Sequence, residues 1–193
     1  MTIPNLISIA RLFLVPLAVW LIISGRPVWA FWVFLLAGVS DALDGFLARR
    51  FNMRSDLGGY LDPLADKALL ISMYVTFATL NEVHVWVTIL IVSRDILIIG
   101  GVIIAWMLGV PMAMRPNWIS KVNTLAQIVL AGVILADLAF SPDLAVLRLQ
   151  LSWVVGTLTL ISALAYAVEF VRHMGGAEGG GPGARSGGQP SPS

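Results

Sequence analysis

The chain has 193 residues, of which 58% are hydrophobic and only 12% are charged, with a formal net charge of +1. Soluble domains carry about a quarter charged residues, so this composition argues against a soluble globular domain and indicates a polytopic membrane protein. The chain has no basic tract interleaved with aromatic residues, which argues against a nucleic-acid partner. It also lacks cysteine, which excludes disulfides, thiolate nucleophiles and zinc–thiolate sites.

Six apolar runs follow one another along the chain, and each is long enough to cross a bilayer as a helix. We expect an all-α integral membrane protein, with six transmembrane helices in one bundle and a short N-terminal interfacial segment. The predicted helices cover about residues 4–24, 27–51, 59–80, 83–108, 117–140 and 143–174. The membrane domain is expected to span residues 1–173. Residues 174–193 are expected to form a disordered cytoplasmic tail, because a Gly/Ser/Pro-rich segment buries too little apolar surface to fold.

Lys and Arg residues predict the orientation of this bundle, because they are enriched in cytoplasmic connections. They gather at the connection between the second and third helices and at the connection between the fourth and fifth. The opposite side carries only Arg26 and Arg148. Both basic connections, and therefore both termini, are expected on the cytoplasmic side.

Four carboxylates stand at helical spacing in a chain that otherwise avoids charge. Asp41 and Asp44 are three residues apart, and Asp62 and Asp66 are four apart, so each pair shares one face of its helix. The short connection between the two helices should bring both pairs to a similar depth near the cytoplasmic boundary. Charges at bilayer depth are costly and mark functional sites, and hard divalent cations prefer oxygen ligands. We therefore expect one or two divalent ions here.

Small residues and one arginine complete the pattern D-x2-D-G-x2-A-R-x8-G-x3-D-x3-D, which the chain meets at every position. On this pattern the chain resembles the CDP-alcohol phosphatidyltransferase family, and its opening PNLISIAR looks like that family's N-terminal segment. The resemblance implies transfer of a phosphatidyl group from CDP-diacylglycerol to an alcohol, with release of CMP. It also implies a homodimer among membrane lipids, in a bacterial or mitochondrial inner membrane, with the active site facing the cytoplasm or matrix.

The resemblance also implies residue roles, carried over by position. The expected ligands of Mg²⁺ or Mn²⁺, with two ions expected, are Asp41, Asp44, Asp62 and Asp66. Asp66 is in addition the expected catalytic general base towards the acceptor hydroxyl. The residues expected to line the cytidine diphosphate site are Gly45, Ala48, Arg49 and Gly58.

Further polar residues point to the acceptor. Arg94, mid-way along the fourth helix, is costly unless paired, so it either forms an internal pair with Asp95 or another carboxylate, or binds the acceptor's phosphate. Lys121 either reaches that phosphate or anchors the fifth helix at the interface. The expected acceptor-binding set is Arg94, Arg115 and Lys121. By contrast, Lys67 is expected to pair structurally or snorkel, and Asp137 to make a polar contact within the bundle.

Two branches of the family differ in their acceptor. VSRDILI together with PNWISKVNT looks most like the cardiolipin synthases, which use phosphatidylglycerol. The phosphatidylglycerophosphate synthases use glycerol 3-phosphate and typically carry a second Arg about seven residues after the first, where this chain has Gly100, Gly101 and Val102. Phosphatidylglycerol is therefore the favoured acceptor, and glycerol 3-phosphate is the alternative.

Two other classes of membrane protein use intramembrane carboxylates. A metal-ion transporter is one, although the carboxylates here cluster at one level and none continues across the membrane. A prenyltransferase is the other, and it would release pyrophosphate instead of CMP.

Overall fold

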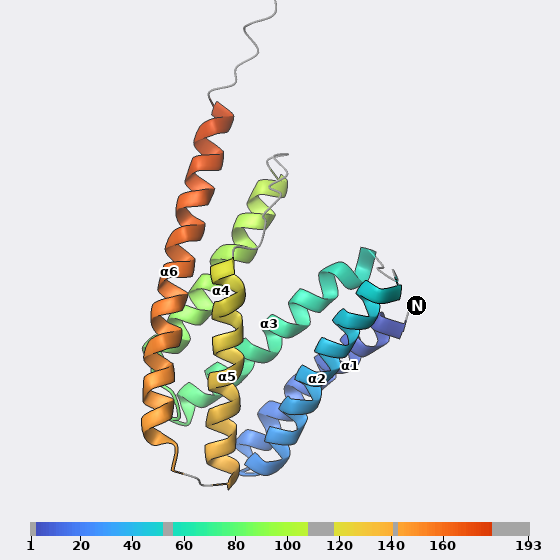
Figure 1. Ribbon diagram of the computed structural model, residues 1–193, viewed down its shortest axis with the longest axis vertical. Coiled ribbons are helices and arrows are strands. Elements are labelled where there is room, and N and C mark those ends of the chain that lie inside the picture. Colours follow the sequence, from blue (N-terminus) through green and yellow to red (C-terminus); the bar gives the residue numbers. More distant parts are fainter. Residues whose placement is uncertain (1–2, 52–55, 108–117, 141–142, 179–193) are drawn as a thin grey trace, which may run out of the picture.

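In a computed structural model, the described residues of the protein form six α-helices (Figure 1). The structure describes the backbone of residues 3–51, 56–107, 118–140 and 143–178, and the side chains of residues 10–41, 67–100, 118–140 and 143–168. The helices are α1 (Ile3–Ile23), α2 (Pro27–Phe51), α3 (Asp56–Thr79), α4 (Val85–Met107), α5 (Trp118–Phe140) and α6 (Ala145–Glu178). Each helix begins and ends within about one turn of the predicted position, which confirms the all-helical fold. Helix α6 runs to Glu178, into the first residues of the Gly-rich stretch.

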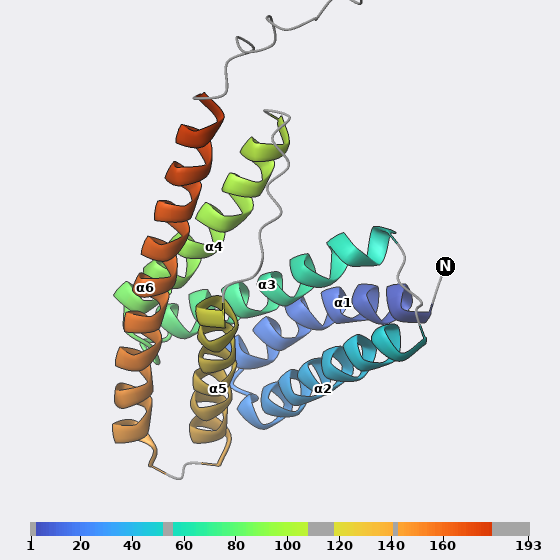
Figure 2. The same cartoon turned by 45° about the horizontal axis from the view of Figure 1, so that its top comes forward.

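The helices alternate in direction along the bundle. The ends of α1, α3 and α5 lie with the starts of α2, α4 and α6 at one end, at the bottom of Figure 1. From this end the helices diverge, with α1, α2 and α3 leaning to one side and α4 and α6 to the other (Figure 2). Helix α1 packs against both α2 and α3, α5 packs against α2, α3 and α6, and α4 packs against α3 and α6. The end of α2 and the start of α3, which carry the carboxylate pattern, lie at the opposite end from these turns.

Tight turns at the first end follow from residues that accept a left-handed backbone. After α1, Gly25 has φ 67°, its N–H donates to Ile22 O at 3.1 Å, and Arg26 N–H donates to Leu21 O at 2.9 Å. After α3, Asn81 has φ 61°, and Glu82 N–H donates to Phe77 O at 2.8 Å. Both are Schellman caps, which satisfy the last carbonyls of a helix, and Gly and Asn are the residues that adopt this conformation most readily.

Helix α3 is the most enclosed of the six in the described part of the chain. Its buried side chains are Leu69, Leu70, Met73, Tyr74, Thr76 and Phe77, and Val75 is its one exposed large apolar residue there. The other five helices expose many large apolar side chains, including Phe13 at 72%, Ile96 at 61% and Val146 at 70%. A soluble monomer rarely exposes contiguous apolar surface on this scale, so the outer surface suits a lipid environment.

Two helices are long and apolar enough to cross a membrane by length and composition within the described residues, Trp118–Phe140 and Ala145–Val168. Shorter apolar stretches occur at Ala10–Ile23, Pro27–Asp41 and Lys67–Thr79. By length and composition, α5 and α6 are consistent with the membrane character predicted from the sequence.

Candidate functional site

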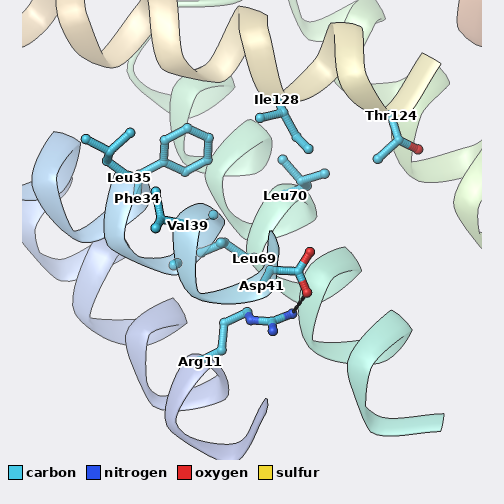
Figure 3. Close-up of a pocket in the computed structure, with 11 residues that line it drawn as sticks. Arg11, Phe34, Leu35, Val39, Asp41, Leu69, Leu70, Thr124 and Ile128 are labelled. Atoms are coloured by element: carbon cyan, nitrogen blue, oxygen red, sulfur yellow. Dashed lines mark ion pairs between the residues drawn. The ribbon is translucent and has the colours of Figure 1, made fainter. Parts of the chain in front are cut away.

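A buried arginine holds the first carboxylate of the pattern. Arg11 Nη1 on α1 donates to Asp41 Oδ1 on α2 at 2.7 Å, and the two side chains point toward each other (Figure 3). The Arg11 side chain is only 1% exposed, whereas that of Asp41 is 44% exposed. Because an unpaired buried charge is costly, Arg11 needs this carboxylate as a partner. The pair thus fixes the Asp41 carboxylate in place while leaving part of it accessible.

Asp41 lines an apolar cavity of about 390 Å³ between α2, α3 and α5. Arg11 and Asp41 provide its charged groups and Thr124 a hydroxyl, while the remaining lining residues are apolar or glycine (Figure 3). These are Phe34, Leu35, Ala37, Gly38, Val39, Leu69, Leu70 and Ile128. We call this cavity the apolar groove. A charged head at the edge of an apolar groove suits an amphiphile, with its polar group at Asp41 and its hydrocarbon in the groove.

The remaining residues of the pattern fall on the same two helices. Residues Asp44, Gly45, Ala48 and Arg49 follow Asp41 along α2. Gly58, Asp62 and Asp66 lie in the first half of α3. The side chains of these seven residues lie outside the described residues, so their roles stay predictions.

The described part of the predicted metal site, Asp41, fits a hard cation. One oxygen of Asp41 accepts from Arg11, and an ionised carboxylate has a second oxygen and further lone pairs for a cation. Within the described side chains no group of three or more acidic, His or Cys residues gathers to hold a metal ion, because Asp41 is the one predicted ligand among them. Asp41 is therefore suited to act as one ligand among several.

A second charged cluster lies inside the bundle, where α3, α4, α5 and α6 meet. Asp95 Oδ1 on α4 accepts from Lys67 Nζ on α3 at 2.5 Å and from Arg94 Nη1 at 2.6 Å. Arg94 also donates to the hydroxyls of Ser162 on α6, at 3.2 and 3.3 Å, and of Ser120 on α5. We call Lys67, Arg94 and Asp95 the cationic cluster, because two cations share one carboxylate.

The structure can be compared with the sequence predictions for the acceptor-binding residues and for Lys67. The Arg94–Asp95 pair and the pairing of Lys67 are both confirmed. These pairs do not test whether Arg94 also binds the acceptor's phosphate, which stays a prediction. Lys121 lies in the first turn of α5, exposed, with its ammonium 5.4 Å from the Trp118 ring centroid. Arg115 lies outside the described residues.

A third cluster lies at the other end of the bundle. Arg148 at the start of α6 pairs with Glu82 at 2.5 Å and with Asp137 at 2.7 Å, and it also donates to the Glu82 carbonyl. Asp137 additionally accepts from the backbone N–H of Leu144 at 3.0 Å. The predicted polar contact of Asp137 is therefore confirmed, and we call Glu82, Asp137 and Arg148 the turn cluster.

Sequence reasoning missed Arg11 as a partner of the carboxylate pattern. The available signal was its position, since Arg11 is the one charged residue in α1. An arginine isolated in an apolar helix needs an anionic partner, and α1 packs against both carboxylate-bearing helices. The seryl partners of Arg94 were also missed, because an isolated serine gives no comparable signal.

Comparison with known proteins gives consistent matches. A family model described as CDP-alcohol phosphatidyltransferase matches residues 1–167. A protein of Oryza sativa subsp. japonica, named CDP-diacylglycerol–glycerol-3-phosphate 3-phosphatidyltransferase 1, chloroplastic, is 32% identical over 188 residues, which are 88% of this chain and 57% of the relative. The Homo sapiens protein named cardiolipin synthase (CMP-forming) is 38% identical over 156 residues, 72% of this chain and 52% of the relative.

A bacterial relative is matched over nearly its whole length. The Shigella flexneri serotype 5b protein named CDP-diacylglycerol–glycerol-3-phosphate 3-phosphatidyltransferase is 36% identical over 174 residues, which are 85% of this chain and 92% of the relative. The chain thus spans about half the length of the rice and human relatives and most of the Shigella protein.

Proposed function

Because the chain belongs to the CDP-alcohol phosphatidyltransferase family, we propose that it transfers a phosphatidyl group from CDP-diacylglycerol to an alcohol in phospholipid synthesis. The observation that carries this proposal is the Arg11–Asp41 pair at the edge of the apolar groove. CDP-diacylglycerol is an amphiphile with a diphosphate head and hydrocarbon chains. The groove suits one acyl chain, and the Asp41 carboxylate would help to hold a divalent cation that offsets the charge of the diphosphate.

The proposed reaction is a displacement at phosphorus. The acceptor hydroxyl oxygen forms a bond to the phosphorus that carries diacylglycerol, the bond from that phosphorus to the CMP oxygen breaks, and CMP leaves. Asp66 takes the proton of the attacking hydroxyl as general base. When bound by Asp41, Asp44, Asp62 and Asp66, Mg²⁺ or Mn²⁺ supplies Lewis-acid polarisation of the phosphoryl oxygens. Arg11 keeps the Asp41 carboxylate oriented throughout.

Phosphatidylglycerol is the proposed acceptor, which would make the product cardiolipin. Support comes from the VSRDILI and PNWISKVNT segments, from the missing second Arg after Arg94, and from the name of the human relative. The names of the rice and Shigella relatives favour glycerol 3-phosphate as the alternative. Either acceptor carries a phosphate, and the cationic cluster, with Lys121 and Arg115, offers the positive charge to receive it.

The proposed setting is a bacterial or mitochondrial inner membrane crossed by all six helices. Exposed apolar side chains on α1, α2, α4, α5 and α6 support this arrangement. The excess of Lys and Arg at the carboxylate-bearing end supports a cytoplasmic or matrix location for that end, by the positive-inside rule. The homodimer implied by the family resemblance stays a prediction.

The test is an assay on the purified chain in detergent, with Mg²⁺ and labelled CDP-diacylglycerol. Phosphatidylglycerol, glycerol 3-phosphate and inositol phosphate are offered separately, and both CMP and the lipid product are identified. We expect cardiolipin and CMP, and loss of both after chelation of divalent metal. Phosphatidylglycerophosphate with CMP would keep the chemistry and change the acceptor.

Other outcomes would overturn the proposal. Absence of CMP with every acceptor, from folded protein, would exclude the proposed transfer. Pyrophosphate release would point to prenyl transfer, and metal flux into proteoliposomes that is lost in Asp62→Asn would point to a transporter.

A further inference from the structure

Asp95 joins two cations that come from different helices. One of its oxygens accepts from Lys67 on α3 and from Arg94 on α4. The Asp95 side chain is 1% exposed and that of Arg94 2%, so neither charge is balanced by water. Since two cations share one carboxylate, the cluster carries a net charge of +1 among these three side chains. This positive excess is only partly buried, since the Lys67 side chain is 24% exposed, and it favours the arrival of an anion.

Two residues of the cluster and its surroundings adjoin proposed functional residues in the sequence. Lys67 directly follows Asp66, the proposed general base, along α3. Ser120, which accepts from Arg94, directly precedes Lys121, a proposed acceptor-binding residue, along α5. Asp95 therefore joins Lys67, which follows the proposed base in sequence, to Arg94, whose partner Ser120 precedes Lys121 in sequence.

Hydroxyl groups complete the hold on Arg94. Ser162 accepts from Arg94 Nε and Nη2, and Ser120 accepts from Nη2, while Asp95 accepts from Nη1. A planar guanidinium with partners on three sides has one fixed orientation. Pre-oriented charges bind an anion at lower cost than mobile ones, because their side-chain entropy is already lost.

We propose that Asp95 is a positioning residue that orients Arg94 and Lys67 to receive the phosphate of the acceptor. The inference rests on the proposed function, since it deepens the acceptor site of that reaction. Asp95 itself bears the same charge as the acceptor phosphate, so its contribution is geometric and opposes the direct electrostatic effect. This opposition gives the proposal a test in which the two effects have opposite signs.

The decisive comparison is Lys67→Met against Lys67→Met/Asp95→Asn. Adding Asp95→Asn changes the cluster charge from 0 to +1, the value found in the wild-type cluster. If the cluster acts only by electrostatic attraction of the anion, the double variant should have a lower KM for the acceptor than Lys67→Met. Positioning predicts that it rises, by about tenfold, because Arg94 loses its anchor, while the KM for CDP-diacylglycerol stays within about twofold.

Two more variants separate positioning from loss of folding. Asp95→Glu retains the charge and should recover most of the acceptor affinity. Ser162→Ala loosens Arg94 without changing any charge, and should raise the acceptor KM by about threefold in a protein of near-normal thermal stability. Asp137→Asn is the matched control, because it removes an Asp–Arg pair that lies about 25 Å along α5 from Ser120. It should leave the acceptor KM unchanged.

The outcomes are distinct for the two levels of inference. Wild-type protein that releases no CMP with any acceptor overturns the proposed function and this inference with it. If the wild-type protein is active, this inference alone is overturned when the acceptor KM of Lys67→Met/Asp95→Asn is equal to or lower than that of Lys67→Met. If the Asp95 variants do not fold, an unchanged acceptor KM in Ser162→Ala overturns it.

Discussion

The turn cluster at one end of the helical bundle and the cationic cluster inside it both pair an arginine with carboxylate, but with opposite charge balance. The turn cluster has one cation, Arg148, between two carboxylates, and it ties the start of α6 to the ends of α3 and α5. The cationic cluster has two cations around Asp95 and lies deeper, with Arg94 and Asp95 almost fully buried. The first arrangement satisfies charges and backbone groups where the chain turns. The second leaves one excess positive charge among its three described side chains, of which Lys67 is partly exposed.

This difference separates structural charge from charge available for binding. Arg148 donates hydrogen bonds to the carboxylates of Glu82 and Asp137 and to the Glu82 carbonyl, as expected for a residue that fixes a turn. Arg94 is held by one carboxylate and two serine hydroxyls, so its positive charge is only partly offset. Breaking each cluster in turn should therefore affect different measurements.

The largest effect is expected from Asp66→Asn. An amide is isosteric with the carboxylate but accepts no proton, and it is a poorer ligand for a hard cation. Loss of a general base typically costs about 10²–10⁴-fold in rate, so CMP release should almost vanish while CDP-diacylglycerol still binds. Initial rates of CMP release and equilibrium binding of the nucleotide lipid measure the two effects separately.

Asp137→Asn is the control at the opposite end, and it should retain near-normal turnover. Turnover above a tenth of wild type in Asp66→Asn would remove Asp66 from the base role. Equal losses in both variants would mean that the two ends are not functionally distinct.

Much of this fold could be predicted from sequence because its signals are local. Apolar runs of bilayer length set the helices, and the residues that end α1 and α3, Gly25 and Asn81, are of the type that helix caps require. The Arg94–Asp95 and Lys67 pairings also followed from the cost of unpaired buried charge. Local patterns therefore predict both the elements and the need for partners.

Partner identity was harder to predict, because it depends on how the helices pack. Arg11 and Asp41 are thirty residues apart and meet because α1 packs against α2. The hydroxyls of Ser120 and Ser162 reach Arg94 from two other helices. The residue pattern within one helix does not indicate which residues of other helices it will contact. The sequence therefore predicts Asp41 as a site residue but does not predict Arg11 as its partner.

Substitution of Arg11 should produce the next largest effect. Arg11→Met leaves Asp41 without its buried donor, and loss of a group that orients a metal ligand typically costs about 10–100-fold in metal affinity or activity. The Mg²⁺ concentration for half-maximal CMP release should rise by that factor, and Arg11→Lys should recover part of it.

Arg26→Met is the matched control, since Arg26 lies exposed in the turn between α1 and α2, beside the Trp20 ring. Its Mg²⁺ dependence should equal that of wild type. An unchanged Mg²⁺ dependence in Arg11→Met would show that Arg11 does not support the proposed metal site.

A smaller effect is expected from filling the apolar groove. A Cβ at Gly38 meets nothing within 4 Å, so Gly38→Leu places a side chain in the groove without an immediate clash. Displacing about two methylenes of an acyl chain, at about 0.8 kcal/mol each, should raise the KM for CDP-diacylglycerol roughly tenfold. Gly100→Leu is the control, because Gly100 is equally open and lies outside the groove lining. Equal KM values for both variants would exclude the groove as the acyl-chain site.

The smallest effect on activity is expected from the turn cluster, where the loss should appear in stability. Arg148→Met leaves Glu82 and Asp137 without their shared cation and removes hydrogen bonds between α6 and the two turns. Hydrogen bonds to charged groups contribute about 1.5–3 kcal/mol, so the free energy of unfolding should fall by about 2 kcal/mol, measured by thermal unfolding in detergent. Asp143→Asn, at an exposed position in the same turn, should leave it unchanged. Because the net-positive charge lies at the other cluster, the acceptor KM of Arg148→Met should stay at the wild-type value, and a rise would show that the turn also shapes the acceptor site.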